Sequence, residues 1–318
     1  MRIVTYDEIE PEQANLLTLV CFGLPMTPGS VELIRKLDKR SSDYYGVYAL
    51  DDNGRPVSQV IVLHIDTKTR DGIEKVAGMV AVGTLPGHAR QGLSTALMRR
   101  AHELSKDRGM RISMLTTSAS LVAYDMYSKL GYSTLATFNR GIKPLTHTKP
   151  RKTRALKLRA FKLTDAKPLD RAFASQTKDA LGFVCRQPEY VAMRVRSFQT
   201  SAEKIKVATI GGKIVGYALT NKIDDYAEIQ ELVAIDDSSR LRILEAVGRQ
   251  PKAGWLICTG VCDRRLSNLY TTQGFNMYES GWGRVMATCL DGSLSNEGIA
   301  KLYGADQDHF VINALDSF

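Results

Sequence analysis

The chain has 318 residues, of which 44% are hydrophobic and 24% are charged, and its formal net charge is +9. This composition favours two globular domains of about 150 residues each over one, and no apolar stretch is long enough to span a bilayer. The N-terminus is polar and acidic, unlike a signal peptide, and five scattered cysteines favour neither a disulfide framework nor a zinc site, so we expect a cytoplasmic protein without a metal.

The first half of the chain predicts a mixed series of strands and helices. Helices are expected at 10–21, 30–39, 92–108 and 119–130, and strands at 45–50, 57–65, 76–84 and 112–117. The turn Asp52-Asn53-Gly54 should join the first two strands as a hairpin. Strands with helices interposed imply an α/β layered domain with a mixed sheet.

The junction between the strand at 76–84 and the next helix is the most informative segment. A polar turn at 87–91 leads into a helix that opens at Gly92. The first turn of a helix has free backbone N–H groups and partial positive charge, and a glycine lets an anion approach the backbone. We therefore predict a pyrophosphate cradle there. Its residues would be Arg90, Gln91, Gly92, Leu93, Ser94 and Thr95.

A plain strand-turn-helix connection is the alternative to this cradle. The glycine spacing matches neither a Walker A loop nor a dinucleotide fingerprint. The residues of the loop alone therefore leave both interpretations open.

Most of the net positive charge comes from the middle of the chain, where residues 149–167 hold eight basic residues and one acidic residue. We interpret 149–156 as a solvated basic linker, followed by a strand with one charged face. A nucleic-acid-binding patch is the alternative, and the lack of interleaved aromatic residues disfavours it.

The second half repeats landmarks of the first. The segment at 123–132, AYDMYSKLGY, matches LSNLYTTQGF at 266–275, and the openings of the chain and of the segment at Leu158 also match. We infer an internal duplication with domains at 1–148 and 157–318. In the second copy Asp236 and Asp237 occupy the turn that should meet phosphates, without a glycine. That copy is predicted to be degenerate and not to bind the anion.

The segment VAVGTLPGHARQGLSTALMRRAHEL at 80–104 resembles the cofactor motif of Gcn5-related N-acetyltransferases (GNAT), in which a strand and a proline precede (Gln/Arg)-x-x-Gly-x-(Gly/Ala). When this segment is aligned with the motif on Pro86 and Gly92, two of its positions differ from the motif. Ala89 replaces Gln or Arg, and Ser94 replaces Gly or Ala. The same segment also resembles the first domain of the enhanced-intracellular-survival type of acetyltransferases.

The resemblance implies two tandem GNAT-like acyl-CoA N-acyltransferase domains, the second degenerate, with acetyl-CoA as co-substrate of the first. Pantetheine would meet the strand end at Val82, Gly83 and Thr84, and Ser120 takes the asparagine position of the family's Asn-x-x-Ala-x-x-x-Tyr helix. Tyr127 matches the family's general acid, because a phenol stays protonated at neutral pH and can protonate the leaving thiolate.

The expected reaction is direct attack by a primary amine on the thioester in a ternary complex. The general base is left open among Glu74, His64, Asp66 and a water chain. The expected partner is an amine-bearing small molecule or peptide, and homo-oligomerisation is left open. A catalytically silent acyl-CoA-binding regulatory module is the alternative function.

Overall fold

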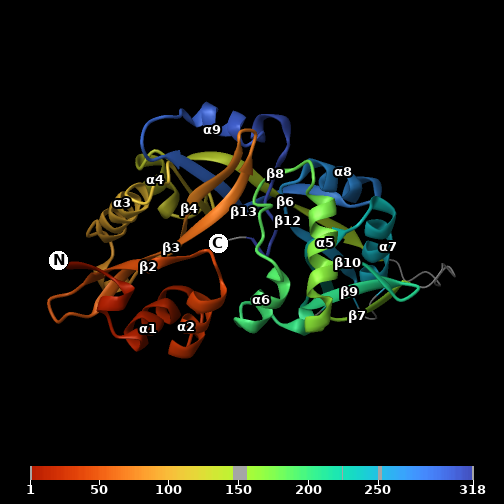
Figure 1. Cartoon of the computed structure of the whole chain (residues 1–318), viewed down its shortest axis with the longest axis horizontal. Coiled ribbons are helices and arrows are strands. Elements are labelled where there is room, and N and C mark those ends of the chain that lie inside the picture. Colours follow the sequence, from red (N-terminus) through yellow and green to blue (C-terminus); the bar gives the residue numbers. More distant parts are fainter. Residues whose placement is uncertain (1, 146–155, 224, 250–252, 317–318) are drawn as a thin grey trace. The chain divides into compact units, whose positions relative to one another are not determined.

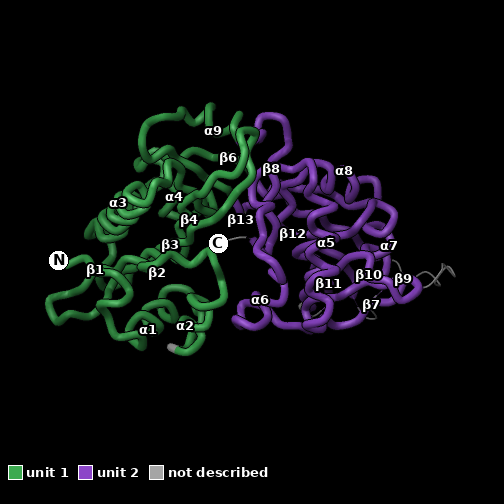
Figure 2. Tube along the Cα trace, viewed as in Figure 1, with its two compact units in different colours: residues 1–136, 284–302, 318 green, residues 137–283, 303–317 purple. Residues whose placement is uncertain are grey.

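The computed structural model describes residues 2–145, 156–223, 225–249 and 253–316 (Figure 1). The chain forms two compact units, each built from two stretches: residues 1–136 with 284–302, and residues 137–283 with 303–317 (Figure 2). Of the predicted linker at 149–156, only Leu156 lies within the described residues. Among these residues, no helix is both long enough and apolar enough to cross a membrane.

The first unit is built on one mixed sheet. Its strands follow the order β1 (Arg2–Thr5), β2 (Ser41–Leu50), β3 (Pro56–Thr69), β4 (Gly72–Thr84), β5 (Ile112–Thr117) and the last residues of β13 (Asn276–Cys289). Neighbouring strands are antiparallel except β4 and β5, which are parallel. The helices are α1 (Pro11–Phe22), α2 (Pro28–Leu37), α3 (Leu93–Lys106), α4 (Ala123–Lys129) and α9 (Asn296–Leu302).

Side chains that alternate along β2 divide the helices of the first unit between two layers. Val47 and Ala49 pack in one hydrophobic cluster with Leu97 of α3, whereas Tyr48 packs in another with Leu17 of α1. Successive residues of a strand point to opposite faces, so α1 and α3 cover opposite faces of the sheet. The end of β4 therefore lies between these two helices.

The second unit has the same construction. Its sheet follows the order β7 (Lys157–Ala160), β9 (Ile205–Ile210), β10 (Lys213–Ile223), β11 (Tyr226–Ala234), β12 (Trp255–Val261) and the last residues of β6 (Ser133–Pro144). Its helices are α5 (Ala166–Gln176), α6 (Tyr190–Arg196), α7 (Asp237–Gly248) and α8 (Arg264–Thr272). The short strands β8 (Leu181–Gly182) and β14 (Phe310–Val311) form a parallel pair.

The order of elements from β1 to β6 recurs from β7 to β13, with β8 as an insertion. The helices α1, α2, α3 and α4 correspond to α5, α6, α7 and α8, and the sheet of each unit ends with a strand from the other half of the chain. The predicted mixed α/β fold and tandem organisation are confirmed. The domain boundaries at 148 and 157 stay a prediction.

One predicted element begins later than expected. The helix expected at 119–130 starts at Ala123. The Ser118 hydroxyl lies 3.2 Å from the backbone nitrogen of Ser120, which donates to it, and 2.7 Å from the Ser120 hydroxyl. Serine side chains that bond nearby backbone groups compete with helix formation, which explains the late start.

Candidate functional site

The strands β4 and β5 pair only briefly. Ala77–Met79 lie opposite Ser113–Leu115, and β4 then continues to Thr84 while remaining paired to β3 on its other edge. Within the described part of the chain, the edge of β4 from residue 80 onward has no partner strand on the β5 side. Its free backbone groups can therefore bind the amides of an extended ligand.

A β-bulge lies at this point of β4. The register with β3 shifts between Gln59 and Ile61, and Ala81 adopts a φ of 48°. A non-glycine residue in the left-handed region is strained, and such strain is often found at functional sites. Sequence reasoning missed Ala81, because alanine carries no signal for this conformation.

Gly83 leaves no room for a side chain, because the end of α1 packs against it, and the sequence did not indicate this constraint. A methyl group at this position would lie 2.7 Å from Cζ of Phe22 and 3.0 Å from Cβ of Cys21. The end of α1 therefore touches the backbone of β4 directly. The predicted contact between the Gly83 backbone and a cofactor stays a prediction.

The loop before α3 has the conformation of an anion site. Arg90 has a φ of 62° and Gly92 a φ of 77°, and a side chain at Gly92 would meet no atom within 4 Å. No backbone N–H from Arg90 to Thr95 has an acceptor among the described residues. Successive free N–H groups at a helix start bind phosphate oxygens, so this loop fits the pyrophosphate of an acyl-CoA.

The side chains of the predicted cradle divide into two groups. Arg90 and Gln91 are exposed, whereas Leu93 is buried in the core and can offer only its backbone. The Ser94 hydroxyl lies 2.8 Å from that of Thr84, which in turn lies 2.7 Å from that of Ser58. These hydroxyls join the start of α3 to the ends of β3 and β4.

Tyr127 combines a buried ring with a hydroxyl that has no partner among the described residues. The residue is 6% exposed, and its ring packs edge-on against Tyr132 with centroids 6.0 Å apart. Burial raises the pKa of Tyr127 to about 12. Among the described residues its hydroxyl has no hydrogen-bond partner, and it is not one of the fully enclosed unpaired polar atoms. Such a group can donate a proton to a ligand.

A polar network lies next to Tyr127. Nε2 of His102 is 2.8 Å from the Tyr132 hydroxyl, which is 2.6 Å from the Ser113 hydroxyl, and Ser113 donates to the Ala77 carbonyl. Burial lowers the pKa of His102 to about 4. His102 is not a surface residue, because α3 turns this side chain onto the core, where it bonds to Tyr132.

Two of the candidate bases, Glu74 and Asp66, lie far from the strand end. Glu74 pairs with Arg111 at 2.9 Å and Asp66 pairs with Lys75 at 2.6 Å, both at the opposite end of β4. Nine residues separate Glu74 from Gly83, a span of about 30 Å in an extended strand. In the described residues, no group of three or more His, Cys, Asp or Glu side chains is placed to hold a metal ion.

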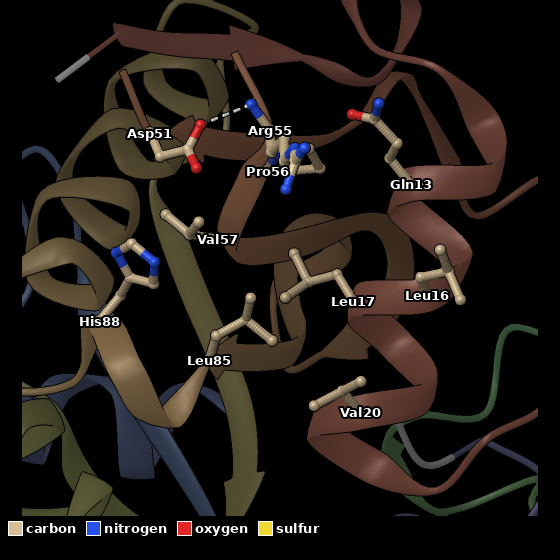
Figure 3. Close-up of a pocket in the computed structure, with 10 residues that line it drawn as sticks. All are labelled: Gln13, Leu16, Leu17, Val20, Asp51, Arg55, Pro56, Val57, Leu85 and His88. Atoms are coloured by element: carbon tan, nitrogen blue, oxygen red, sulfur yellow. Dashed lines mark hydrogen bonds between the residues drawn. The ribbon is translucent and has the colours of Figure 1, made fainter. Parts of the chain in front are cut away.

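A cavity of about 460 Å³ lies between α1 and the start of β3, next to the loop (Figure 3). Leu85 and His88, which flank the first residues of the loop, face it together with apolar side chains of α1 (Figure 3). The remaining lining residues are Gln13, Leu16, Leu17, Val20, Asp51, Arg55, Pro56 and Val57. Asp51 accepts the backbone N–H of Arg55 at 2.8 Å, which closes the β2–β3 turn.

In the second unit, the helix start and the diverging strand ends that correspond to those of the first unit contact other groups of the same unit. The Asp236 carboxylate caps α7 by accepting the Ser239 N–H at 2.7 Å. The strands β11 and β12 pair only from Tyr226–Ile229 and Trp255–Cys258, and the C-terminal segment lies beside the unpaired ends. Leu315 donates its N–H to Glu231 of β11 at 2.9 Å, and Ile312 donates to the sulfur of Cys262 at 3.2 Å.

Comparisons with known proteins agree with this architecture. Residues 2–135 match the family model described as an acetyltransferase (GNAT) domain. A GCN5-related N-acetyltransferase from Kribbella flavida is similar at 18% identity, over 91% of this chain and 71% of that chain, with a TM-score of 0.64. Eis1 from Mycobacterium abscessus is similar at 18% identity, over 92% and 74%, with a TM-score of 0.62.

A tandem GNAT protein from the clavulanic acid biosynthesis pathway is similar at 14% identity, over 92% of this chain and 99% of that chain, with a TM-score of 0.55. No curated protein sequence matches the chain. At these identities the solved structures establish the fold alone. Residues 2–135 are therefore similar to a GNAT acetyltransferase domain, and the chain shares its fold with the tandem GNAT protein and the other solved structures.

Proposed function

We propose that this protein is an acetyl-CoA-dependent N-acetyltransferase that acts on a primary amine in a ternary complex. The observation that supports this most is the loop before α3, where the N–H groups from Arg90 to Thr95 are free and the space at Gly92 is open. The unpaired edge of β4 continues from this loop toward the bulge at Ala81. One ligand with a diphosphate and an extended amide chain would satisfy both features.

The residues of the first unit would divide the work between binding and proton transfer. Acetyl-CoA supplies the acetyl group as an activated thioester. The amides at Gly92 would hold its pyrophosphate, and a backbone N–H of β4 near Gly83 would stabilise the developing oxyanion. The amine nitrogen forms the new bond to the acetyl carbon, the carbon–sulfur bond breaks, and the amine releases a proton to solvent.

Tyr127 would supply the proton to the departing sulfur. Its pKa of about 12 keeps the phenol protonated at neutral pH. A thiol has a reference pKa of about 8.5, so transfer from a neutral phenol to a forming thiolate becomes favourable only when the transferred proton is replaced from solvent. The Tyr127 hydroxyl, which has no partner among the described residues, would be free to receive that proton.

We further propose that only the first unit binds acyl-CoA. In the second unit the Asp236 carboxylate already satisfies the start of α7, and the C-terminal segment bonds to Glu231 and Cys262 beside the diverging strands. Tyr270, the counterpart of Tyr127, is 1% exposed. The second unit would then serve as a packing partner.

A direct experiment separates this function from a silent acyl-CoA-binding module. Acetyl-CoA is incubated with a panel of primary amines, and the release of free thiol is followed in time. Amine-dependent release is expected for the enzyme. CoA binding without thiol release against every amine would favour the silent module, and no binding at all would contradict both.

A further inference from the structure

The ring of Phe22 lies directly against the backbone of Gly83, at the strand end where the proposed function requires the thioester. A methyl group at position 83 would lie 2.7 Å from Cζ and 2.9 Å from Cε2 of this ring, closer than real Cβ atoms approach other atoms. The ring therefore fills the space above the strand on the α1 side of the sheet. Any group bound at this point of β4 meets the ring on that side.

The position of Phe22 is set by the end of its helix. Phe22 is the last residue of α1, and Gly23 ends the helix with a φ of 65° while its N–H donates to the Leu19 carbonyl at 2.8 Å. On the same helix Ala14 and Leu17 are buried, whereas Phe22 is 38% exposed. The ring is thus anchored by the backbone without being enclosed by the core.

The strand beyond the ring offers further apolar surface. Leu85 lies two residues after Gly83, directly after the last residue of β4, and packs against the hydrophobic cluster that contains Leu17 of α1. It lines the cavity of about 460 Å³ together with Val20 of α1. A chain that passed the ring would therefore find apolar side chains against which to bury its methylene groups.

We propose that Phe22 sets the upper size of the acyl group that the first unit accepts, admitting acetyl and excluding straight chains of four carbons or more. This inference rests on the proposed function, since it requires an acyl-CoA with its thioester beside Gly83. It adds a specificity residue on α1, outside the loop and Tyr127. The ligand class is a short-chain acyl thioester.

The test compares acetyl-CoA and butyryl-CoA by calorimetry in the wild-type protein, Phe22→Ala and Leu19→Ala. Leu19 is a matched control, because it lies on the same helix, is 43% exposed and is not among the atoms nearest to a methyl group at position 83, which belong to Phe22 and Cys21. The wild-type protein should bind acetyl-CoA more tightly. Phe22→Ala should shift the affinity ratio toward butyryl-CoA by about tenfold, because two more methylenes become buried. Leu19→Ala should leave the ratio unchanged.

The outcomes separate this inference from the proposed function. If the wild-type protein binds neither thioester, the proposed function fails and this inference fails with it. If both bind but the ratio in Phe22→Ala equals the wild-type ratio, or if the wild-type protein does not discriminate, only the role of Phe22 is overturned. Thiol release with either donor, measured as kcat/KM, should follow the same ratio.

A second measurement needs no CoA. Gly83→Ala should lower the Tm, because the new methyl group meets the Phe22 ring. Adding Phe22→Ala should restore part of that loss, so that the double variant melts higher than the sum of the single effects predicts. Strictly additive shifts in Tm would show that the ring does not press on residue 83 and would overturn the proposal.

Discussion

The two copies of the fold begin the same helix in opposite ways. The helix α3 opens at Gly92 with free N–H groups and an exposed Arg90, whereas α7 opens at Asp236, whose carboxylate accepts the Ser239 N–H. A helix start attracts an anion, and each copy meets that requirement differently. The first leaves room for an external anion, and the second carries its own.

The same contrast recurs at the diverging strands and at the tyrosine of the following helix. Among the described residues, the edge of β4 that faces β5 has no partner strand beyond Met79, while the C-terminal segment lies beside the ends of β11 and β12. The Tyr127 hydroxyl has no partner among the described residues, while Tyr270 is enclosed and bonds to Cys258. One fold can therefore present an open ligand site or satisfy the same groups internally, and a few residues decide which.

The largest expected effect is on CoA binding, when a carboxylate is placed at the start of α3. Gly92→Glu places a carboxylate where the phosphates would lie and should weaken CoA binding by about 100-fold or more, measured by calorimetry. Gly109→Glu is the control, since Gly109 has a φ of 78° and open space at the other end of α3. Both variants carry the same backbone strain of about 1–2 kcal/mol, so equal CoA affinity in the two would contradict the loop assignment.

The next effect concerns Tyr127, whose counterpart in the second copy, Tyr270, is enclosed. Tyr127→Phe should lower kcat by about 10- to 100-fold and leave CoA affinity unchanged, because it removes a proton donor without altering the loop. Tyr124→Phe is the control on the same helix, where the hydroxyl contacts Thr134. An unchanged kcat for Tyr127→Phe in thiol release would remove Tyr127 from the mechanism.

The buried histidine should make the first unit sensitive to acid. His102 has a folded pKa of about 4, below the usual 6.5, so the unfolded chain binds the proton first as the pH falls. Unfolding free energy should therefore be constant above pH 6.5 and fall by about 1–3 kcal/mol between pH 6.5 and 4.

Denaturant unfolding across this pH range measures that effect. His102→Gln keeps a partner for Tyr132 but cannot titrate, so its stability should depend less on pH than that of the wild-type protein. The second copy lacks this pair, because helix α7 carries no histidine and Phe275 stands at the position of Tyr132. Parallel pH profiles for the two proteins would show that His102 is not the sensitive group.

The smallest expected effect is on stability, when the Asp236 cap at the start of α7 is removed. Asp236→Ala removes the cap of α7 and should cost about 1 kcal/mol, seen as a lower Tm. It should not create a second CoA site, because the C-terminal segment still bonds to Glu231. Two bound CoA molecules per chain in this variant would mean that the cap alone closes the second copy.

Local patterns in the sequence predicted most of the first unit. The strand Ile112–Thr117 was predicted to the residue and α3 to within one residue at its start, because apolar periodicity and Gly92 mark these elements. The duplication was visible in the repeated Tyr-x-x-x-Gly-aromatic segments. The roles of the loop residues and of Tyr127 stay predictions.

The features that the sequence did not reveal depend on distant contacts. Gly83 is explained by Phe22, some sixty residues earlier in the chain, and the bulge at Ala81 by its pairing with β3. The position of the C-terminal segment depends on Glu231 and Cys262. No periodicity within one element reports such contacts, so only the folded chain shows them.

Calorimetric titration of the wild-type chain with CoA tests the central claim most directly. We expect one CoA bound per chain, at a site that Gly92→Glu eliminates and Gly109→Glu retains. No detectable heat of binding, or binding that Gly92→Glu leaves unchanged, would contradict the assignment of the cofactor site to the start of α3.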